Sequence, residues 1–314
     1  GSVYKPDKNL KAPLSLEWQT RQFRLSPLPG PYELGSLIRD FILDERSGPD
    51  LAIVRVMTTS NQFYTLYVDP PYNYVLPITD IPSGLGGAND QFAYTGSDYY
   101  VIARGTNAVK TSRSGYWHDW QTSDAATDPF MGVSGVTAKN NFIYVNDASG
   151  IRKYSPDGTL IKRTAYPNAA NYFGEVAVDD AGNYFATDIA NSQVVKISPE
   201  GVELARWGSY GTKNGQFINP LSPSLDPEGR VYVADPYNNR IQVFSSTGEY
   251  LFKAGNAVND ADAAEPAPFS ISSGKLGFPL RLAVLPSYQG YISNNGKDIT
   301  GQDFLRYSVL TLDA

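Results

Sequence analysis

Short runs of alternating hydrophobic and polar residues, separated by turn residues, cover most of the chain. Residues 226–255 show the pattern most clearly: alternating runs at 231–234, 241–244 and 250–253 follow an apolar run that ends at Asp226. A period of two between turn signals is typical of β-strands. The segment therefore predicts four short antiparallel strands, and we expect negligible helix in the chain.

The same pattern occurs 47 positions upstream, where residues 179–208 align with 226–255 without a gap. The residues that begin and end the turns are repeated. They include Asp179 with Asp226, Gly182 with Gly229, Asp188 with Asp235, and Gly201 with Gly248. A repeat of this length that encodes four strands is typical of one blade of a β-propeller.

Weaker copies of the pattern occur on both sides of this pair. The further candidates are residues 37–68, 99–115 and 142–163, and a C-terminal stretch that begins at 279 and ends with 304–312. We therefore predict an all-β fold, a six-bladed β-propeller of four-stranded antiparallel blades. A ring must close, or its terminal blades expose sheet edges. The alternating segment 16–25 is expected to complete the last blade beside residues 304–312.

No linker-like or low-complexity segment divides the chain, so we expect one domain over residues 1–314. Gly1 and Ser2 are expected to be a cloning remnant. Two long segments, 70–94 and 116–132, are rich in aromatic residues and are expected to be loops.

Composition and charge narrow the function classes. The formal net charge of −6 disfavours nucleic acid as a partner, because phosphate binding needs a basic surface. The chain has no Cys, which excludes disulfides, Cys-ligated zinc and a Cys nucleophile. No apolar run reaches the length of about 18 residues that spans a bilayer, so we expect no direct membrane insertion.

Several repeated residues have structural explanations. The carboxylates of Asp188 and Asp235 follow a strand and can accept backbone N–H groups of a turn. Trp207 and Phe217 are expected to pack between blades. Arg240 could recognise an anionic ligand, although pairing with a carboxylate or carbonyl of a neighbouring blade is the favoured interpretation.

The strongest segment resembles an NHL repeat. The residues that carry the resemblance are Gly215-Gln216-Phe217, Pro220, Asp226, Gly229, residues 231–235, residues 238–244 and Gly248. The match is strong over 172–255. The resemblance implies a propeller, often six-bladed, and a range of functions: RNA-binding and protein-binding domains, bacterial extracellular sensor domains and a metal-dependent peptide-amidating lyase. It leads us to expect a secreted, periplasmic or cell-surface monomeric domain.

The chain has few residues for catalysis. The lyases of this kind hold zinc with several histidines, whereas this chain has one, His118. A Ser-His-Asp triad would also need His118. We therefore favour a non-catalytic binding module without a cofactor. A metal-dependent lactonase or lyase-like propeller enzyme, with calcium or zinc, is the alternative, and calcium held by carboxylates stays open.

The binding site is predicted on the face that collects the loops between second and third strands and the connections between blades. Tyr and Trp side chains on loops make adaptable contact surfaces for proteins or carbohydrates. The candidate contact residues are Trp117, Trp120, Tyr166, Tyr172, Tyr210, Tyr237, Asn238 and Arg240.

Overall fold

The computed structural model describes residues 38–44, 52–58, 61–69, 72–77, 85, 91–103, 106–167, 173–226, 228–254, 279–284, 289–297 and 303–311. Every regular element in these ranges is a strand, apart from two 3-10 turns, η1 (Arg113–Gly115) and η2 (Pro236–Asn238). The all-β prediction is confirmed for the described part of the chain.

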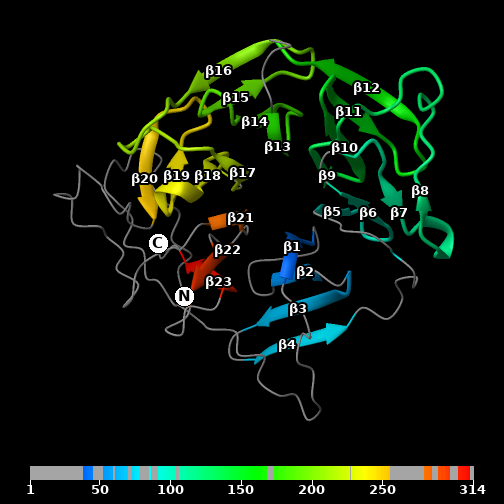
Figure 1. The fold of residues 1–314 in the computed structure, drawn as a ribbon, viewed down its shortest axis with the longest axis horizontal. Coiled ribbons are helices and arrows are strands. Elements are labelled where there is room, and N and C mark those ends of the chain that lie inside the picture. The colour runs from blue at the N-terminus through cyan, green and yellow to red at the C-terminus, as the bar shows by residue number, and fades with distance from the viewer. Residues whose placement is uncertain are drawn as a thin grey trace, which may run out of the picture.

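The strands form sheets that follow one another around a central axis (Figure 1). The first sheet contains β1 (Ile38–Leu43), β2 (Ala52–Thr58), β3 (Phe63–Asp69) and β4 (Tyr72–Pro77). The second contains β5 (Gln91–Tyr94), β6 (Tyr99–Ile102), β7 (Lys110–Thr111) and β8 (His118–Asp119). The third contains β9 (Gly135–Lys139), β10 (Phe142–Asp147), β11 (Gly150–Tyr154) and β12 (Leu160–Ala165).

The fourth sheet contains β13 (Phe173–Val178), β14 (Tyr184–Asp188), β15 (Gln193–Ile197) and β16 (Glu203–Trp207). The fifth contains β17 (Leu221–Leu225), β18 (Val231–Asp235), β19 (Arg240–Phe244) and β20 (Tyr250–Ala254). A further sheet has three strands, β21 (Pro279–Val284), β22 (Gln289–Lys297) and β23 (Asp303–Thr311). All pairings are antiparallel between consecutive strands, so the fold is a β-propeller of four-stranded antiparallel blades.

Two expectations need correction. The structure shows five complete four-stranded blades rather than six, and the three-stranded sheet is the remaining candidate. Segment 16–25, the expected ring-closing strand, lies outside the described residues. The loop expected over 70–94 contains β4, the outermost strand of the first sheet, and also the first residues of the second sheet. The Tyr, Val and Leu side chains of β4 fit a pleated strand, but the prolines on either side of them led to the prediction of a loop.

The repeated turn residues act as the sequence predicts. Asp226 Oδ1 accepts the backbone N–H of Glu228 at 3.1 Å and that of Arg230 at 2.8 Å, which closes the turn between β17 and β18. Gly229 in this turn has a φ of 77°, in the left-handed region that favours glycine. The turn geometry is therefore encoded locally by one carboxylate and one glycine.

Aromatic side chains fill the space between neighbouring blades. Trp207 of β16 packs on Phe244 of β19, with ring centroids 5.9 Å apart, and Phe217 packs on the same ring at 5.5 Å. All three rings belong to one buried cluster between the fourth and fifth sheets. Each such side chain contributes about 1.5–3 kcal/mol when fully buried. The expectation that Trp207 and Phe217 pack between blades is confirmed.

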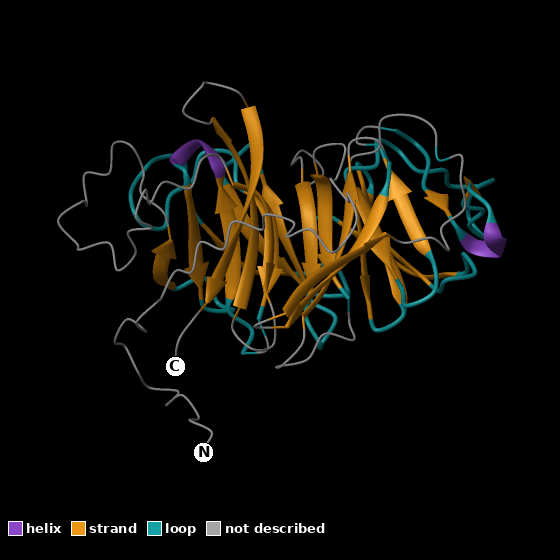
Figure 2. Ribbon diagram, turned by 90° about the horizontal axis from the view of Figure 1, so that it is seen from below, coloured by secondary structure: helices purple, strands orange, loops and turns teal. Residues whose placement is uncertain are grey.

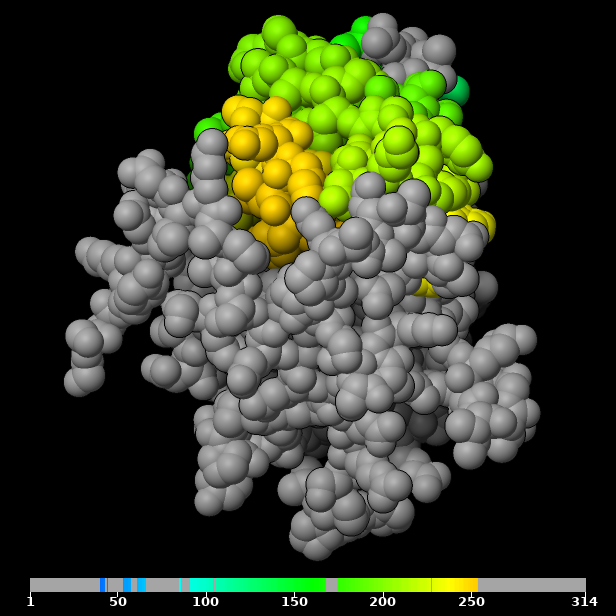
Figure 3. Space-filling view, turned by 90° about the vertical axis from the view of Figure 1, so that its left-hand side faces the viewer, coloured from blue at the N-terminus to red at the C-terminus, as the bar shows by residue number. Residues whose placement is uncertain are grey.

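Hydrogen bonds also join neighbouring blades, as between the second and third and between the third and fourth. The Tyr100 hydroxyl donates to the carbonyl oxygen of Pro156 at 2.9 Å, and the Thr164 hydroxyl donates to that of Pro199 at 2.8 Å. Both acceptors lie in turns between third and fourth strands. The view in Figure 3 shows the described residues of the fourth and fifth sheets, green to yellow, side by side at the rim. The described blades therefore form one continuous scaffold.

Candidate functional site

The strand order creates two chemically different faces. In an antiparallel four-stranded blade, the turn between the second and third strands and the connection to the next blade lie at the same end. We call this end the loop face. The turns between first and second strands and between third and fourth strands lie at the opposite end, the turn face. Figure 2 shows loops at both edges of the ring in side view.

Two tyrosines are prominent on the loop face. Tyr210, in the connection between β16 and β17, is 72% exposed, and Tyr237, in the turn between β18 and β19, is 57% exposed. The two segments touch, because Asn238 Nδ2 donates to the carbonyl oxygen of Gly211 at 2.9 Å. The structure thus brings two exposed tyrosines together on neighbouring, mutually bonded loops.

A buried ion pair supports these loops. Arg240 is 0% exposed, and its Nε donates to Asp235 Oδ2 at 2.8 Å. Its Nη2 donates to the carbonyl oxygens of Lys213 and Gln216 at 2.8 and 2.7 Å. Burial raises the pKa of the Asp235 carboxyl, and the charge of Arg240 acts in the opposite direction. The carboxylate partner of Arg240 lies in the same blade, not in a neighbouring blade as expected, while the carbonyl partners belong to the connection that carries Tyr210.

Further bonds hold that connection in one conformation. Gln242 Nε2 donates to the carbonyl oxygen of Gln216 at 2.6 Å, and Gln242 Oε1 accepts the N–H of Gly215 at 2.8 Å. Asp235 Oδ1 accepts the N–H of Ile218 at 2.9 Å. The carboxylate therefore accepts a backbone N–H as expected, but from the preceding connection rather than from its own turn. Asp188 does accept within its own turn, from the N–H of Asn191 at 3.1 Å.

The two faces differ in exposed charge over the third to fifth blades. Among the described loop-face residues there, Lys213 is the one exposed side chain that is charged at neutral pH. The described turn-face segments expose carboxylates and no Lys or Arg; these acids are Asp157, Asp180, Glu200, Glu228 and Glu249. The loop face is therefore nearly neutral and aromatic, while the turns of the turn face expose carboxylates, of which Asp180, Glu200 and Glu228 are paired with Lys139, Lys162 and Arg230.

Some predicted contact residues lie elsewhere. Trp117 is located between β7 and β8, the third and fourth strands of its blade, so it belongs to the turn face. Its ring stacks on Phe63 with centroids 5.9 Å apart. Trp120 is buried, edge-to-face with Tyr100 and Tyr154 at 4.8 and 5.2 Å.

The remaining predicted contact residues are half-buried, buried or outside the described ranges. Tyr166 is half-buried, and its hydroxyl donates to the side chain of Asn146. Asn238 and Arg240 are buried and act as supports for the loops. Tyr172 lies outside the described ranges. Of the predicted set, Tyr210 and Tyr237 are the strongly exposed pair that the structure brings together.

His118 lies on β8, the outermost strand of its blade, away from the central axis. Its ring contacts that of Tyr116 at 4.7 Å, and its Nδ1 is 3.1 Å from the carbonyl oxygen of Tyr116. This position does not suit a ligand to a metal ion at the central axis of the propeller.

We predict that His118→Ala changes the melting temperature by less than about 2 °C, because the half-exposed ring makes local contacts only. Differential scanning calorimetry checks this value. A loss of many degrees would show that the ring has a structural role that these contacts do not explain.

Two features bear on other site classes. In the part of the chain that the structure describes, no group of three or more Asp, Glu or His side chains could hold a metal ion. None of the described helical segments is long and apolar enough to cross a membrane.

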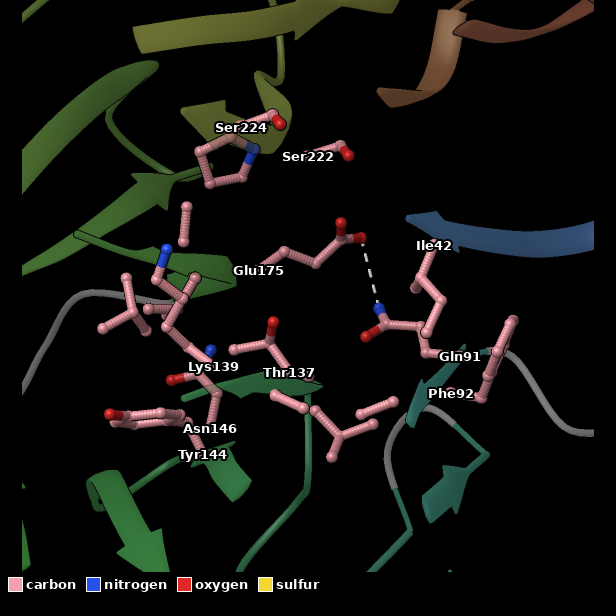
Figure 4. A pocket seen from close by; sticks show the side chains of 18 of the residues that line it. Ile42, Gln91, Phe92, Thr137, Lys139, Tyr144, Asn146, Glu175, Ser222 and Ser224 are labelled. Carbon is pink, nitrogen blue, oxygen red and sulfur yellow. Dashed lines mark hydrogen bonds between the residues drawn. The ribbon is translucent and has the colours of Figure 1, made fainter. Parts of the chain in front are cut away.

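A cavity of about 280 Å³ lies at the axis of the ring (Figure 4). Innermost strands of all five complete blades, β1, β5, β9, β13 and β17, contribute to its wall. Gln91 Nε2 donates to Glu175 Oε1 across the cavity at 3.2 Å. The sequence pattern did not reveal this cavity. A sequence signal for the cavity was available: a polar residue, such as Glu175 or Ser222, stands in an innermost strand whose other residues are mostly apolar or small.

The comparisons with known proteins agree with the repeat pattern. The NHL repeat profile matches residues 217–244. NHL repeat-containing protein 3 of Mus musculus is 32% identical over 173 residues, which cover 48% of this chain and 50% of that protein. Peptidyl-glycine alpha-amidating monooxygenase of Mus musculus is 31% identical over 118 residues, which cover 35% of this chain and 11% of that protein. The chain thus spans half or less of the length of these relatives.

A solved streptogramin B lyase superposes with a TM-score of 0.53 at 15% identity, covering 89% of this chain and 84% of the lyase. This likeness shows the propeller fold alone. The repeat profile, the NHL-containing relatives and the ring of four-stranded blades lead to one conclusion: the chain is a β-propeller that contains an NHL repeat and is similar to NHL repeat-containing proteins over about half of its length.

Proposed function

We propose that this propeller is a non-catalytic interaction module that binds a protein through its loop face, at Tyr210 and Tyr237. The observation that carries the proposal is the exposure of both rings on loops that Asn238 and the buried Arg240 hold in place. Rings on preorganised loops lose little conformational entropy when a partner covers them.

The chemistry of the loop face supports a protein partner over nucleic acid. Tyrosine is enriched among the residues that dominate binding energy at protein interfaces. Nonspecific affinity for nucleic acid comes mainly from several Lys or Arg contacts to phosphates, and the described loop face of blades three to five exposes one such cation, Lys213. The partner surface is expected to be uncharged or weakly acidic opposite this lysine.

The alternative, a metal-dependent lactonase or lyase, is supported by the similarity of the fold to that of the solved lyase. Four expectations stay predictions: an extracytoplasmic location, a monomeric state, carbohydrate as the loop-face partner and the absence of a cofactor.

The loop-face proposal predicts site-selective crosslinking. A photoreactive phenylalanine analogue at position 210 or 237 should crosslink to one protein in its native cell extract. The same analogue at Tyr116, 58% exposed on the turn face, is the matched control and should not. With the captured protein purified, Tyr210→Ala with Tyr237→Ala should weaken binding by at least about 30-fold, as expected when interface hot spots are truncated.

Isothermal titration with the purified partner measures this loss. Tyr116→Ala should leave the affinity unchanged. If the double variant folds and retains wild-type affinity, the partner binds elsewhere and the proposal is wrong.

We also propose that the ring has six blades and that residues 16–25 complete the sheet of β21, β22 and β23. The alternating pattern of 16–25 and the three described strands of this sheet, one fewer than in the complete blades, support this closure. Deletion of residues 1–30 should therefore lower the melting temperature by more than about 10 °C, because joining the two ends stabilises the whole ring. Deletion of residues 1–12 is the control and should leave it unchanged. Equal stability of both truncated chains would contradict the closure.

A further inference from the structure

The axial cavity has a wall in which side chains are fixed before any ligand arrives. Gln91 is buried, and its Nε2 donates both to Glu175 Oε1 at 3.2 Å and to the carbonyl oxygen of Ser134 at 3.3 Å. Asn146, also buried, donates to Ser134 Oγ at 2.9 Å and to the carbonyl oxygen of Gly174. Two amides with defined orientations therefore stand beside a carboxylate that points into the cavity (Figure 4).

Hydroxyl groups line a further part of the polar wall. Thr137, Ser222 and Ser224 come from β9 and β17, and the Tyr144 ring contributes from β10. The described wall thus presents both hydrogen-bond donors and acceptors, between apolar patches.

The charges of the described wall residues disfavour an anionic ligand. Among these residues the carboxylates are Asp40 and Glu175, and Asp40 Oδ2 accepts the N–H of Phe92 at 2.9 Å. The lining cation Lys139 is paired with Asp180 at 2.8 Å. A carboxylate has about four lone-pair sites, so Glu175 can accept from a ligand hydroxyl while it accepts from Gln91.

One position of the wall is open because it has no side chain. A Cβ at Gly135 would lie 3.6 Å from Gln91 Oε1 and 3.7 Å from the Cα of Glu175, which are ordinary van der Waals distances. Glycine is therefore not required there by sterics at the Cβ position. Its effect is to widen the cavity between Gln91 and Glu175.

We propose that the axial cavity binds one small polyhydroxylated molecule, of the size of a single sugar ring, through hydrogen bonds to Glu175, Gln91 and the hydroxyls of Thr137 and Ser224. A volume of about 280 Å³ lies just below the usual range of small-molecule sites, about 300–1,000 Å³, and suits a molecule smaller than most ligands of such sites. Fixed amides, hydroxyls and a carboxylate pair with the alternating donors and acceptors of vicinal hydroxyl groups. This site is separate from the loop-face tyrosines.

Saturation-transfer NMR on the full chain tests the proposal with glucose, galactose, mannose, xylose, myo-inositol and glycerol, each alone. At least one of them should show transfer from the protein to its ring or chain protons. The methyl glycosides of a binding sugar then separate two sources: retained binding indicates a terminal sugar of a glycan, and lost binding indicates the free sugar. Absence of transfer for the whole set overturns the proposal.

Variants test whether the saturation transfer comes from binding in the cavity. Gly135→Val adds volume between Gln91 and Glu175 and should abolish the transfer, while Tyr116→Ala on the turn face should not change it. If Gly135→Val does not fold, Thr137→Val decides, since it removes a hydroxyl at nearly constant shape and should weaken binding by about tenfold. Transfer that persists unchanged in the folded cavity variant overturns the proposal. Ethanolamine is tested as a small cationic probe, and binding of ethanolamine without binding of any polyol also overturns the proposal.

Discussion

Replacement of Gly158 by alanine is expected to lower the free energy of unfolding by about 4 kcal/mol. Gly158 has a φ of +90°, which costs a residue with a Cβ about 2 kcal/mol. The added Cβ would also lie 2.2 Å from the carbonyl oxygen of Gln121, and relieving such overlap costs about 2 kcal/mol more because the contact is with backbone. Urea denaturation followed by tryptophan fluorescence measures the change.

Gly96 provides a matched control for this prediction. It has nearly the same conformation, with a φ of +91°, but a Cβ there would meet nothing within 4 Å. Gly96→Ala should therefore cost about 2 kcal/mol, the backbone contribution alone. Equal losses in the two variants would show that the contact between Gly158 and Gln121 does not limit stability.

The second large effect is expected from Arg240→Met. This change leaves the Asp235 carboxyl buried without its guanidinium, and it removes the donor from the carbonyl oxygens of Lys213 and Gln216. Removal of one partner of a buried ion pair typically costs about 3–5 kcal/mol, because the remaining charge stays desolvated. The same denaturation experiment measures it.

Arg113→Met is the control for the ion pair. Arg113 lies 3.8 Å from Asp98, and its side chain is 42% exposed, so solvent screens the interaction. The expected loss is about 0–1 kcal/mol. A comparable loss in both variants would contradict the argument that burial makes the Asp235–Arg240 pair important.

The repeat units were predictable because their signals are local. The strands Val231–Asp235 and Tyr184–Asp188 lie where period-two alternation placed them, and Asp226 and Gly229 form the predicted turn. The second blade was harder to recognise. Its β7 and β8 have two residues each, which is too short for alternation to be visible.

The candidate site was predictable in part. Tyr210 and Tyr237 were expected on the loop face and are exposed there. Trp117 was assigned to that face too, although the turn that carries it joins a third to a fourth strand. The error came from the missed strand β8, because an unrecognised strand reverses the end at which the next loop emerges.

By itself, the amino-acid sequence determined the repeat, the four-stranded unit and its turns, because these depend on side-chain alternation and on residues a few positions apart. Only the tertiary structure decided which aromatic rings are buried, since Trp120 is covered by Tyr100 and Tyr154, the latter from the next blade. It also decided that Gln91 and Glu175, 84 positions apart, meet at the axis. Such proximity arises from the closing of blades around a common axis, and no local pattern encodes the distance between residues on different blades.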